Sequence, residues 1–248
     1  MNKMIATHYP KLKMIKESLK GNVYVARNLS GKNECHKLVL VKTYKEDHKR
    51  CLPNFDPKNT QARLESNFLS RMEGSNVCPL FLDSFQTETL SAVVMEYLNK
   101  DWVNLFYYSL EVRKEDPLKV IFKNLINALK SLESNNLFYV DLRPENIMVN
   151  VVDYSVKIID LEDTLEYDDS CSHKHSRERI GIMSYCGPEV VMKVDYDVKM
   201  GQVFSLGCLL FSCIEQELLF TDEGATLKGR KTSYVSSSAN AKEFINMC

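Results

Sequence analysis

The sequence predicts an α+β protein with a small strand-rich lobe followed by a larger, mainly helical lobe. In the first hundred residues, four short β-rich runs surround one amphipathic segment, whereas beyond Asn99 apolar residues repeat at helical spacing. The composition, 44% hydrophobic and 26% charged over 248 residues, supplies ample apolar surface for a core. We expect a single domain over 1–248, with an N-lobe of 1–98 and a C-lobe of 99–248.

The N-lobe is expected to be a small sheet that carries one helix. Its predicted strands are rich in β-branched residues and are bounded by polar, turn-forming stretches. A helix is predicted over 59–72, because its apolar residues share one face. The predicted strands are residues 23–26, 38–41, 80–85 and 92–95.

The C-lobe begins with a long amphipathic helix. Asp116 and Pro117 predict its start as an N-cap followed by a first-turn proline, and 134–136 predict its end. The runs 147–149 and 156–159 predict a hairpin.

A second long helix is predicted after Gln202. It is apolar nearly all round, which is typical of a helix central to a lobe. Its most apolar stretch, 203–214, is too short to span a bilayer. We therefore expect a buried helix and no membrane partner.

Charge and cysteine usage exclude several classes of function. Lys and Arg number 32 against 33 Asp and Glu, so no overall positive field predicts a nucleic-acid partner. The eight cysteines form no Cys-x-x-Cys pair, and the N-terminus has no apolar run typical of a signal peptide. Free thiols and a cytoplasmic or nuclear location are expected.

Residues 139–149, Tyr-Val-Asp-Leu-Arg-Pro-Glu-Asn-Ile-Met-Val, carry the most specific pattern. They resemble the catalytic loop of eukaryotic protein kinases, His-Arg-Asp-Leu-Lys-Pro-Glu-Asn. Nineteen residues after Asp141, Asp160 follows a β-rich run where that family has Asp-Phe-Gly, and 187–189 resemble its Ala-Pro-Glu. The Arg-Pro-Glu-Asn order is closer to the serine/threonine branch than to the tyrosine branch.

The N-lobe carries further parts of the same resemblance. Residues 39–42 resemble the Val-Ala-Ile-Lys strand, and Glu65, 23 residues after Lys42, resembles the lysine's ion-pair partner. Residues 94–98 look like the hinge, with Met95 in the gatekeeper place. The resemblance implies a bilobal protein-kinase-like fold with a small antiparallel sheet, in which Lys42 holds the α- and β-phosphates of ATP.

The resemblance also implies catalytic roles in the C-lobe. Asp141 would accept the proton of the substrate hydroxyl, and Arg143 would place its charge beside the transferring phosphate. Asn146 and Asp160 would hold Mg²⁺, a hard cation that prefers oxygen ligands. The implied cofactors are thus ATP and Mg²⁺, and the implied partner is a protein substrate or a partner kinase. The implied nucleotide-binding residues are Ile15, Gly21, Val23, Lys42, Glu65, Met95, Glu96, Leu98 and Met148.

Two departures from the family affect nucleotide binding. Lys16 and Ser18 replace two of the three glycines of the phosphate-binding loop, of which Gly21 remains. Leu40 replaces the small alanine that lies over the adenine ring. An added isobutyl group at a packed contact typically costs about 1–3 kcal/mol, which is a roughly 5- to 150-fold loss of affinity.

Other departures affect the catalytic and regulatory loops. Val140 replaces an arginine that grips a phosphate, Glu162 a glycine, Ile182 a threonine, and Gln202 an aspartate that braces the catalytic loop. Residues 236–248 resemble a helix well inside the family's large lobe, so its final helices are expected to lack a match. Two interpretations remain open: a weakly active serine/threonine kinase, or a pseudokinase that binds or regulates another kinase.

Overall fold

The computed structural model describes residues 3–17, 21–33, 35–45, 61–87, 90–112, 114–167, 175–176, 181–229 and 234–248. The chain forms two compact units, Met1–Asn99 and Lys100–Cys248, which are described in turn. The predicted α+β fold class with an antiparallel sheet is confirmed. The assignment of residues 1–248 to a single domain stays a prediction.

The first unit is built on a five-stranded sheet in the order β1-β2-β3-β5-β4, with every neighbouring pair antiparallel. Its strands are β1 (Lys11–Glu17), β2 (Asn22–Arg27), β3 (Leu38–Lys45), β4 (Phe81–Gln86) and β5 (Leu90–Glu96). The four predicted runs are confirmed as β2 to β5. Strand β1 was not predicted, because it is an edge strand with six exposed residues and lacks a buried face.

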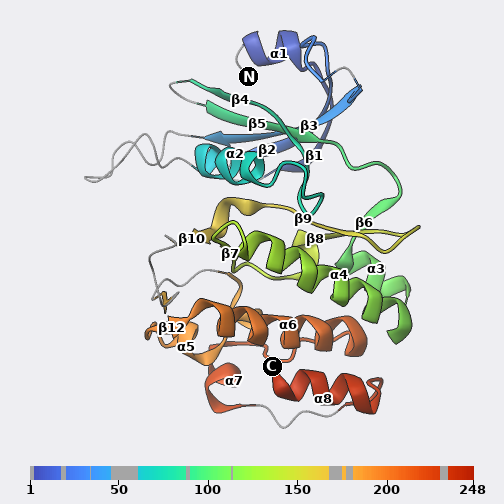
Figure 1. Cartoon of the computed structure of the whole chain (residues 1–248), viewed down its shortest axis with the longest axis vertical. Helices are drawn as coiled ribbons and strands as arrows, with labels where there is room; N and C mark the ends of the chain where they lie inside the picture. The colour runs from blue at the N-terminus through green and yellow to red at the C-terminus, as the bar shows by residue number, and fades with distance from the viewer. Residues whose placement is uncertain are drawn as a thin grey trace. The chain divides into compact units, whose positions relative to one another are not determined.

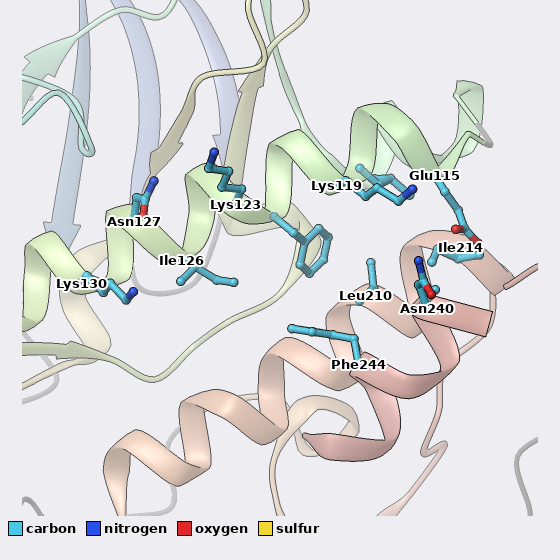
Figure 2. A pocket seen from close by; sticks show the side chains of 13 residues that line it. Glu115, Lys119, Lys123, Ile126, Asn127, Lys130, Leu210, Ile214, Asn240 and Phe244 are labelled. Carbon is cyan, nitrogen blue, oxygen red and sulfur yellow. The ribbon is translucent and has the colours of Figure 1, made fainter. Parts of the chain in front are cut away.

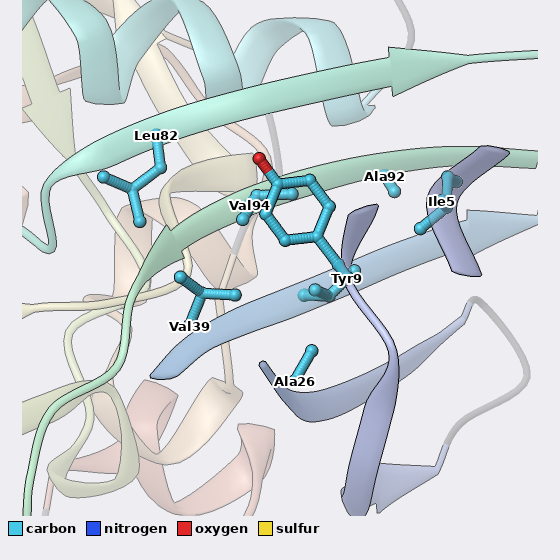
Figure 3. Close-up of a cluster of buried hydrophobic side chains, with 8 residues drawn as sticks. Ile5, Tyr9, Ala26, Val39, Leu82, Ala92 and Val94 are labelled. Atoms are coloured by element: carbon cyan, nitrogen blue, oxygen red, sulfur yellow. The ribbon is translucent and has the colours of Figure 1, made fainter. Parts of the chain in front are cut away.

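The helix α1 (Lys3–His8) covers one face of this sheet (Figure 1). Ile5 and Tyr9 are almost fully buried and pack on residues of β2, β3, β4 and β5, among them Ala26, Val39 and Val94 (Figure 3). The Tyr9 hydroxyl donates a hydrogen bond to Asp83 Oδ2 at 3.2 Å. The N-terminal segment therefore belongs to the core of the first unit, although its residues show no clear helical pattern.

The opposite face of the sheet carries α2 (Gln61–Arg71) (Figure 1). Side chains alternate between faces along a strand, so Val39 and Val41 join the α1 side while Leu40 and Lys42 lie on the α2 side. Helix α2 confirms the prediction over 61–71, and residues 59–60 lie outside the described residues.

The second unit is mainly helical. Its helices are α3 (Leu105–Glu111), α4 (Glu115–Glu133), α5 (Pro188–Val191), α6 (Val198–Glu215), α7 (Glu223–Lys228) and α8 (Ala239–Met247). Its short strands are β6 (Trp102–Asn104), β7 (Leu137–Tyr139), β8 (Ile147–Asn150), β9 (Val156–Ile158), β10 (Thr164–Glu166), β11 (His175–Ser176) and β12 (Tyr196–Asp197). Strands β8 and β9 form the predicted antiparallel hairpin.

Helix α6 is the predicted buried helix, and it begins four residues before Gln202 because Asp197 caps it. The Asp197 carboxylate accepts hydrogen bonds from the backbone N–H groups of Lys199 and Met200. Within the described part of the chain, α6 is the one helix with the length and composition of a membrane span. Of that stretch, 61% is buried inside the structure, as in a core helix.

The start of α4 differs from the prediction. The helix begins at Glu115 with Lys114 as its N-cap, so Asp116 lies in the first turn and does not cap the helix. An acidic first turn still stabilises the helix through its dipole, which explains why a carboxylate is accommodated at either position. The predicted end is confirmed, with Ser134 as the C-cap.

Helix α8 is tied to the end of α6 by a half-buried carboxylate. Glu215 accepts hydrogen bonds from the backbone N–H groups of Val235, Ser236 and Ser237 at 3.1, 2.9 and 2.9 Å, and from the Ser237 hydroxyl. Burial raises the pKa of Glu215, but these hydrogen bonds outweigh burial and leave the pKa below its ordinary value. Folding is therefore linked to ionisation of this group.

We predict that Glu215→Gln destabilises the protein by about 1 kcal/mol at neutral pH, seen as a loss of roughly 2–4 °C in Tm. A depressed folded pKa stabilises the protein above the unfolded pKa, and this stabilisation disappears as pH falls through the folded pKa. Scanning calorimetry from about pH 6 to about pH 3 should show the difference between variant and wild type shrinking. Glu111→Gln, at an exposed position, serves as the control. A pH-independent difference would contradict this account.

Candidate active site

A buried carboxylate organises the first unit beside β3. Glu65 on α2 is 1% exposed, and its Oε1 lies 3.1 Å from Lys42 Nζ. The Tyr44 hydroxyl donates a hydrogen bond to the other oxygen, Oε2. Lys42 Nζ also lies 5.1 Å from the centroid of the Tyr44 ring. A carboxylate is costly to bury, and here each of the two carboxylate oxygens of Glu65 has a partner.

Tyr44 was missed in the sequence analysis. Residues two apart on a strand share a face, so Lys42 and Tyr44 both lie toward α2. That spacing was available in the sequence, but a tyrosine on a strand is more often packing than a donor. The structure makes it a second anchor for Glu65.

Several other residues of the first unit that were predicted to bind nucleotide lie on the same face of the sheet as Lys42. Val23 is the cross-strand neighbour of Lys42, and Leu40 lies in register between Val25 and Met95. Directly paired residues share a face, so all of them lie on the α2 side. Leu40 is half-buried at this position.

The remaining predicted positions in this unit have different environments. Ile15 on β1 is 49% exposed and Leu98 is half-buried. The Glu96 carboxylate accepts a hydrogen bond from the backbone N–H of Leu80 at 3.1 Å. Their assignment to nucleotide binding stays a prediction, and Ser18 of the loop lies outside the described residues.

Gly21 has a packing reason of its own. A Cβ built at this position would lie 1.7 Å from the backbone oxygen of Thr43, so no other residue fits without moving β3. Close approach of two backbones therefore requires this glycine. Its role at phosphate stays a prediction.

In the second unit, the segment that resembles a catalytic loop is held by hydrogen bonds from Asn146 back to Asp141. This residue ends a short 3₁₀ turn, Pro144–Asn146, between β7 and β8. Its Nδ2 donates hydrogen bonds to the Asp141 backbone oxygen at 3.2 Å and to Asp141 Oδ2 at 2.7 Å. Asp141 and Asn146 are both buried, at 7% and 3% exposure, so the amide fixes the carboxylate's orientation.

Arg143 adds a positive charge to the same carboxylate. Its Nε lies 3.1 Å from Asp141 Oδ2, without the alignment of a hydrogen bond. Asn146 and Arg143 thus approach the same oxygen. Among the described residues, no hydrogen bond occupies Asp141 Oδ1. Gly181, with φ of +92°, lies beside that oxygen and has no side chain to cover it.

Hydrogen bonds to the backbone N–H and C=O of Ile159 hold the chain directly before Asp160. The Ile159 N–H donates to the Asn146 oxygen at 2.9 Å, and the Ile159 oxygen accepts from the Tyr139 hydroxyl at 3.2 Å. Asp160 itself has left-handed backbone angles, φ 65° and ψ 64°, which aspartate tolerates better than most residues. Burial raises the pKa of Tyr139, and the nearby carboxylates of Asp141 and Asp160 raise it further.

The donor set in this unit fits a hard cation. Asn146 donates through its Nδ2 to Asp141, which leaves the amide oxygen of Asn146, Oδ1, available as a ligand. Asp160 supplies a carboxylate. Mg²⁺ is commonly held by one or two protein groups together with substrate phosphates. In the described chain, no three His, Cys, Asp or Glu side chains form a metal cluster, so an all-protein cage is not present there. The Cys171–His175 stretch falls outside the described side chains.

Gln202, which replaces the family's bracing aspartate, still contacts the backbone beside this loop. Gln202 Nε2, on α6, donates a hydrogen bond to the backbone oxygen of Tyr139 at 2.9 Å. The tie between the central helix and the loop is therefore kept, with an amide donor in place of a carboxylate acceptor. Val140 packs against the apolar cluster that includes Phe138 and Val190. The remaining predicted residue, Met148, is half-buried on β8.

Comparison with known proteins agrees with this geometry. The protein kinase domain family matches residues 17–246. This chain belongs to the protein kinase family. A PAS domain-containing serine/threonine-protein kinase of Mus musculus is 27% identical over 198 residues, which cover 79% of this chain and 14% of the mouse protein.

Two further relatives have similar identity. A DNA damage response protein kinase of Saccharomyces cerevisiae is 30% identical over 63% of this chain and 34% of its own length. A putative ribosomal protein S6 kinase alpha-1 of Caenorhabditis elegans is 29% identical over 84% of this chain and 25% of its own length. The matched region thus spans about a third or less of these relatives.

We predict that Tyr44→Phe lowers the free energy of unfolding by about 1–2 kcal/mol, because a buried carboxylate oxygen loses a donor. Denaturant titration measures the change. Tyr107→Phe, whose side chain is 61% exposed, is the matched control and should change stability by less than about 0.5 kcal/mol. Equal effects of the two substitutions would show that the Tyr44 hydroxyl does not support Glu65.

Proposed function

We propose that this protein is an ATP- and Mg²⁺-dependent serine/threonine protein kinase that transfers the γ-phosphate to a protein hydroxyl. The observation that carries the proposal is the orientation of Asp141. Asn146 and Arg143 contact its Oδ2 and leave Oδ1 beside the side-chain-free Gly181. A carboxylate held this way is suited to receive a proton from an approaching hydroxyl.

The other groups supply charge and alignment, which are the main requirements of phosphoryl transfer. In the first unit, Lys42, oriented by Glu65, would neutralise phosphate charge. In the second unit, Asn146 Oδ1 and Asp160 would hold Mg²⁺, which when bound neutralises charge on the phosphates. Arg143 would offer its guanidinium to the transferring phosphoryl group, since its side chain is about a quarter exposed.

The relatives support a protein substrate. The mouse relative's name describes a serine/threonine-protein kinase, and membership of the protein kinase family carries the same implication. A protein bearing accessible serine or threonine is therefore the proposed substrate class.

A second candidate is a pseudokinase that acts as a binding module. Leu40 favours it, because this half-buried side chain lies between Val25 and Met95 on the face that carries Lys42. A leucine there reduces the space for a planar base, and two glycines of the phosphate loop are replaced. The enzyme interpretation is preferred because these are supporting positions, whereas Lys42, Asp141, Asn146 and Asp160 are all retained.

Transfer of radiolabelled γ-phosphate to a serine- and threonine-rich protein tests the proposal. Wild-type protein with ATP and Mg²⁺ should label the substrate, and Asp141→Asn should lower the rate by about 100-fold or more. Asp116→Asn, on an exposed carboxylate of α4, is the matched control and should keep wild-type activity.

Two results would overturn the proposal. No labelling by the wild type, in a preparation that is folded and supplied with Mg²⁺, would favour the pseudokinase. Equal labelling by wild type and Asp141→Asn would assign the activity to a contaminant or to another base.

A further inference from the structure

A β-bulge in β1 changes which face of the sheet the last residues of this strand occupy. Met14 pairs with Tyr24, and Tyr24 pairs with Val41, which lies on the α1 side. Regular alternation along the strand would place Lys16, two residues after Met14, on that same side. The register shifts between Met14 and Lys16, however, so Lys16 pairs with Val23. The bulge therefore turns Lys16 to the face that carries α2.

As a result, Lys16 and Lys42 lie in one row that crosses three strands. Val23 on β2 pairs with Lys16 of β1 and with Lys42 of β3. Directly paired residues share a face, so both lysine side chains lie on the α2 side, with Val23 between them. Neighbouring strands are about 4.8 Å apart, which separates the two lysine backbones by about 10 Å. Two positive charges thus flank an apolar residue on one surface of the sheet.

Hydrogen bonds next to this row fix β2 against β3. The buried Thr43 hydroxyl accepts from the backbone N–H of Asn22 at 3.1 Å and donates to the Asn22 backbone oxygen at 2.9 Å. Gly21 lets the two backbones approach closely at the same point. Both contacts are adjacent to the pair of Val23 and Lys42, so the row is held by the sheet itself.

The charge of Lys16 is not compensated within the part of the chain that the structure describes. Lys16 is exposed and forms no ion pair with a carboxylate there. Its neighbour Glu17 lies on the opposite face, because side chains alternate along a strand. Glu65, the buried carboxylate on the α2 side, is paired with Lys42 and Tyr44. Lys16 therefore adds a second positive charge to the face of the sheet that carries Lys42.

We propose that Lys16 is a second phosphate-binding lysine, which contacts the triphosphate of ATP together with Lys42. This inference rests on the proposed function, because it takes the α2 side of the sheet as the nucleotide site. Lys16 stands where the kinase family has a glycine that lets a backbone N–H approach phosphate. An ammonium group on a flexible four-carbon stem supplies a positive donor from the side chain. The substitution thus exchanges one kind of phosphate donor for another.

The spacing of the two lysines suits a polyphosphate. A separation of about 10 Å is roughly one Debye length at physiological salt, so the two amines repel each other only weakly. A triphosphate carries charge along its whole chain, so both amines can bind it without competing for one oxygen. Adenosine has no phosphate and gains nothing from Lys16. The proposal therefore predicts that Lys16 discriminates between nucleotides and nucleosides.

Nucleotide binding to the full chain tests the proposal without requiring phosphotransfer. Calorimetric titration in Mg²⁺ compares ATP with adenosine in the wild type and in variants of Lys16. Lys16→Met keeps a side chain of similar length without the charge, and it should weaken ATP by about tenfold and adenosine by less than about twofold. Lys16→Arg keeps the charge and should weaken ATP by less than about threefold.

Two exposed lysines serve as matched controls for a general effect of charge. Lys37→Met changes the residue directly before β3 in the first unit. Lys123→Met changes α4 of the second unit, beside an apolar cavity among α4, α6 and α8 that includes none of the proposed nucleotide-binding residues (Figure 2). Each substitution should change the affinity for ATP by less than about twofold.

Several outcomes would contradict this role of Lys16. They are equal ATP affinity in Lys16→Met and wild type, equal losses for ATP and adenosine, and an equal loss in Lys37→Met. Tighter ATP binding in Lys16→Ala would show that the lysine obstructs the site. A wild type that binds no ATP would refute this proposal together with the nucleotide site. Lys16-dependent ATP binding without any phosphotransfer would refute the proposed kinase activity alone and would support the role of Lys16.

Discussion

In the first unit, the buried charge of Glu65 constrains the structure around it. A carboxylate with 1% exposure is tolerated only when its oxygens are paired, and both partners, Lys42 and Tyr44, come from β3. Strand β3 is central in the sheet and bonded to β2 and β5, so the register of three strands sets where the two donors lie. The placement of α2 on the sheet follows from that register.

The second unit applies the same rule to a different group of residues. Asp141 is buried and is held by the amide of Asn146, and the backbone of Asn146 in turn fixes Ile159, next to Asp160. Gln202 ties the strand before this loop to α6. The residues that phosphoryl transfer would require therefore also pair with one another and stabilise the fold. Because they have this structural role as well, replacing them would cost stability, whereas a change at a position such as Leu40 would not break these pairs.

The sequence predicted the features that depend on local pattern and on motif spacing. The resemblance to the kinase family, with Glu65 placed 23 residues after Lys42, indicated an ion pair that the structure contains. The β8–β9 hairpin followed from two short β-rich runs, and the buried helix α6 followed from a stretch that is apolar nearly all round. The predictions failed where tertiary contacts decide the outcome.

Two such contacts and one local ambiguity illustrate what was missed. Helix α1 is short, and it is held by burial of Ile5 and Tyr9 on a distant sheet face. Gln202 keeps a brace by reversing the polarity of the hydrogen bond, which no rule for substituting aspartate would give. Helix α4 begins one residue before Asp116, because several polar residues there can start a helix.

Under the proposed function, the retained charged groups would bind ATP and Mg²⁺ although Leu40 replaces a smaller residue. A thermal-shift titration of the full chain with ATP, in Mg²⁺ and in a chelator, tests this most directly. At about 100 times the Kd, binding should add about 2.7 kcal/mol of stability, and the gain should require Mg²⁺ and be larger in Leu40→Ala at equal ATP. An unchanged Tm at millimolar ATP with Mg²⁺, in both wild type and Leu40→Ala, would contradict the account.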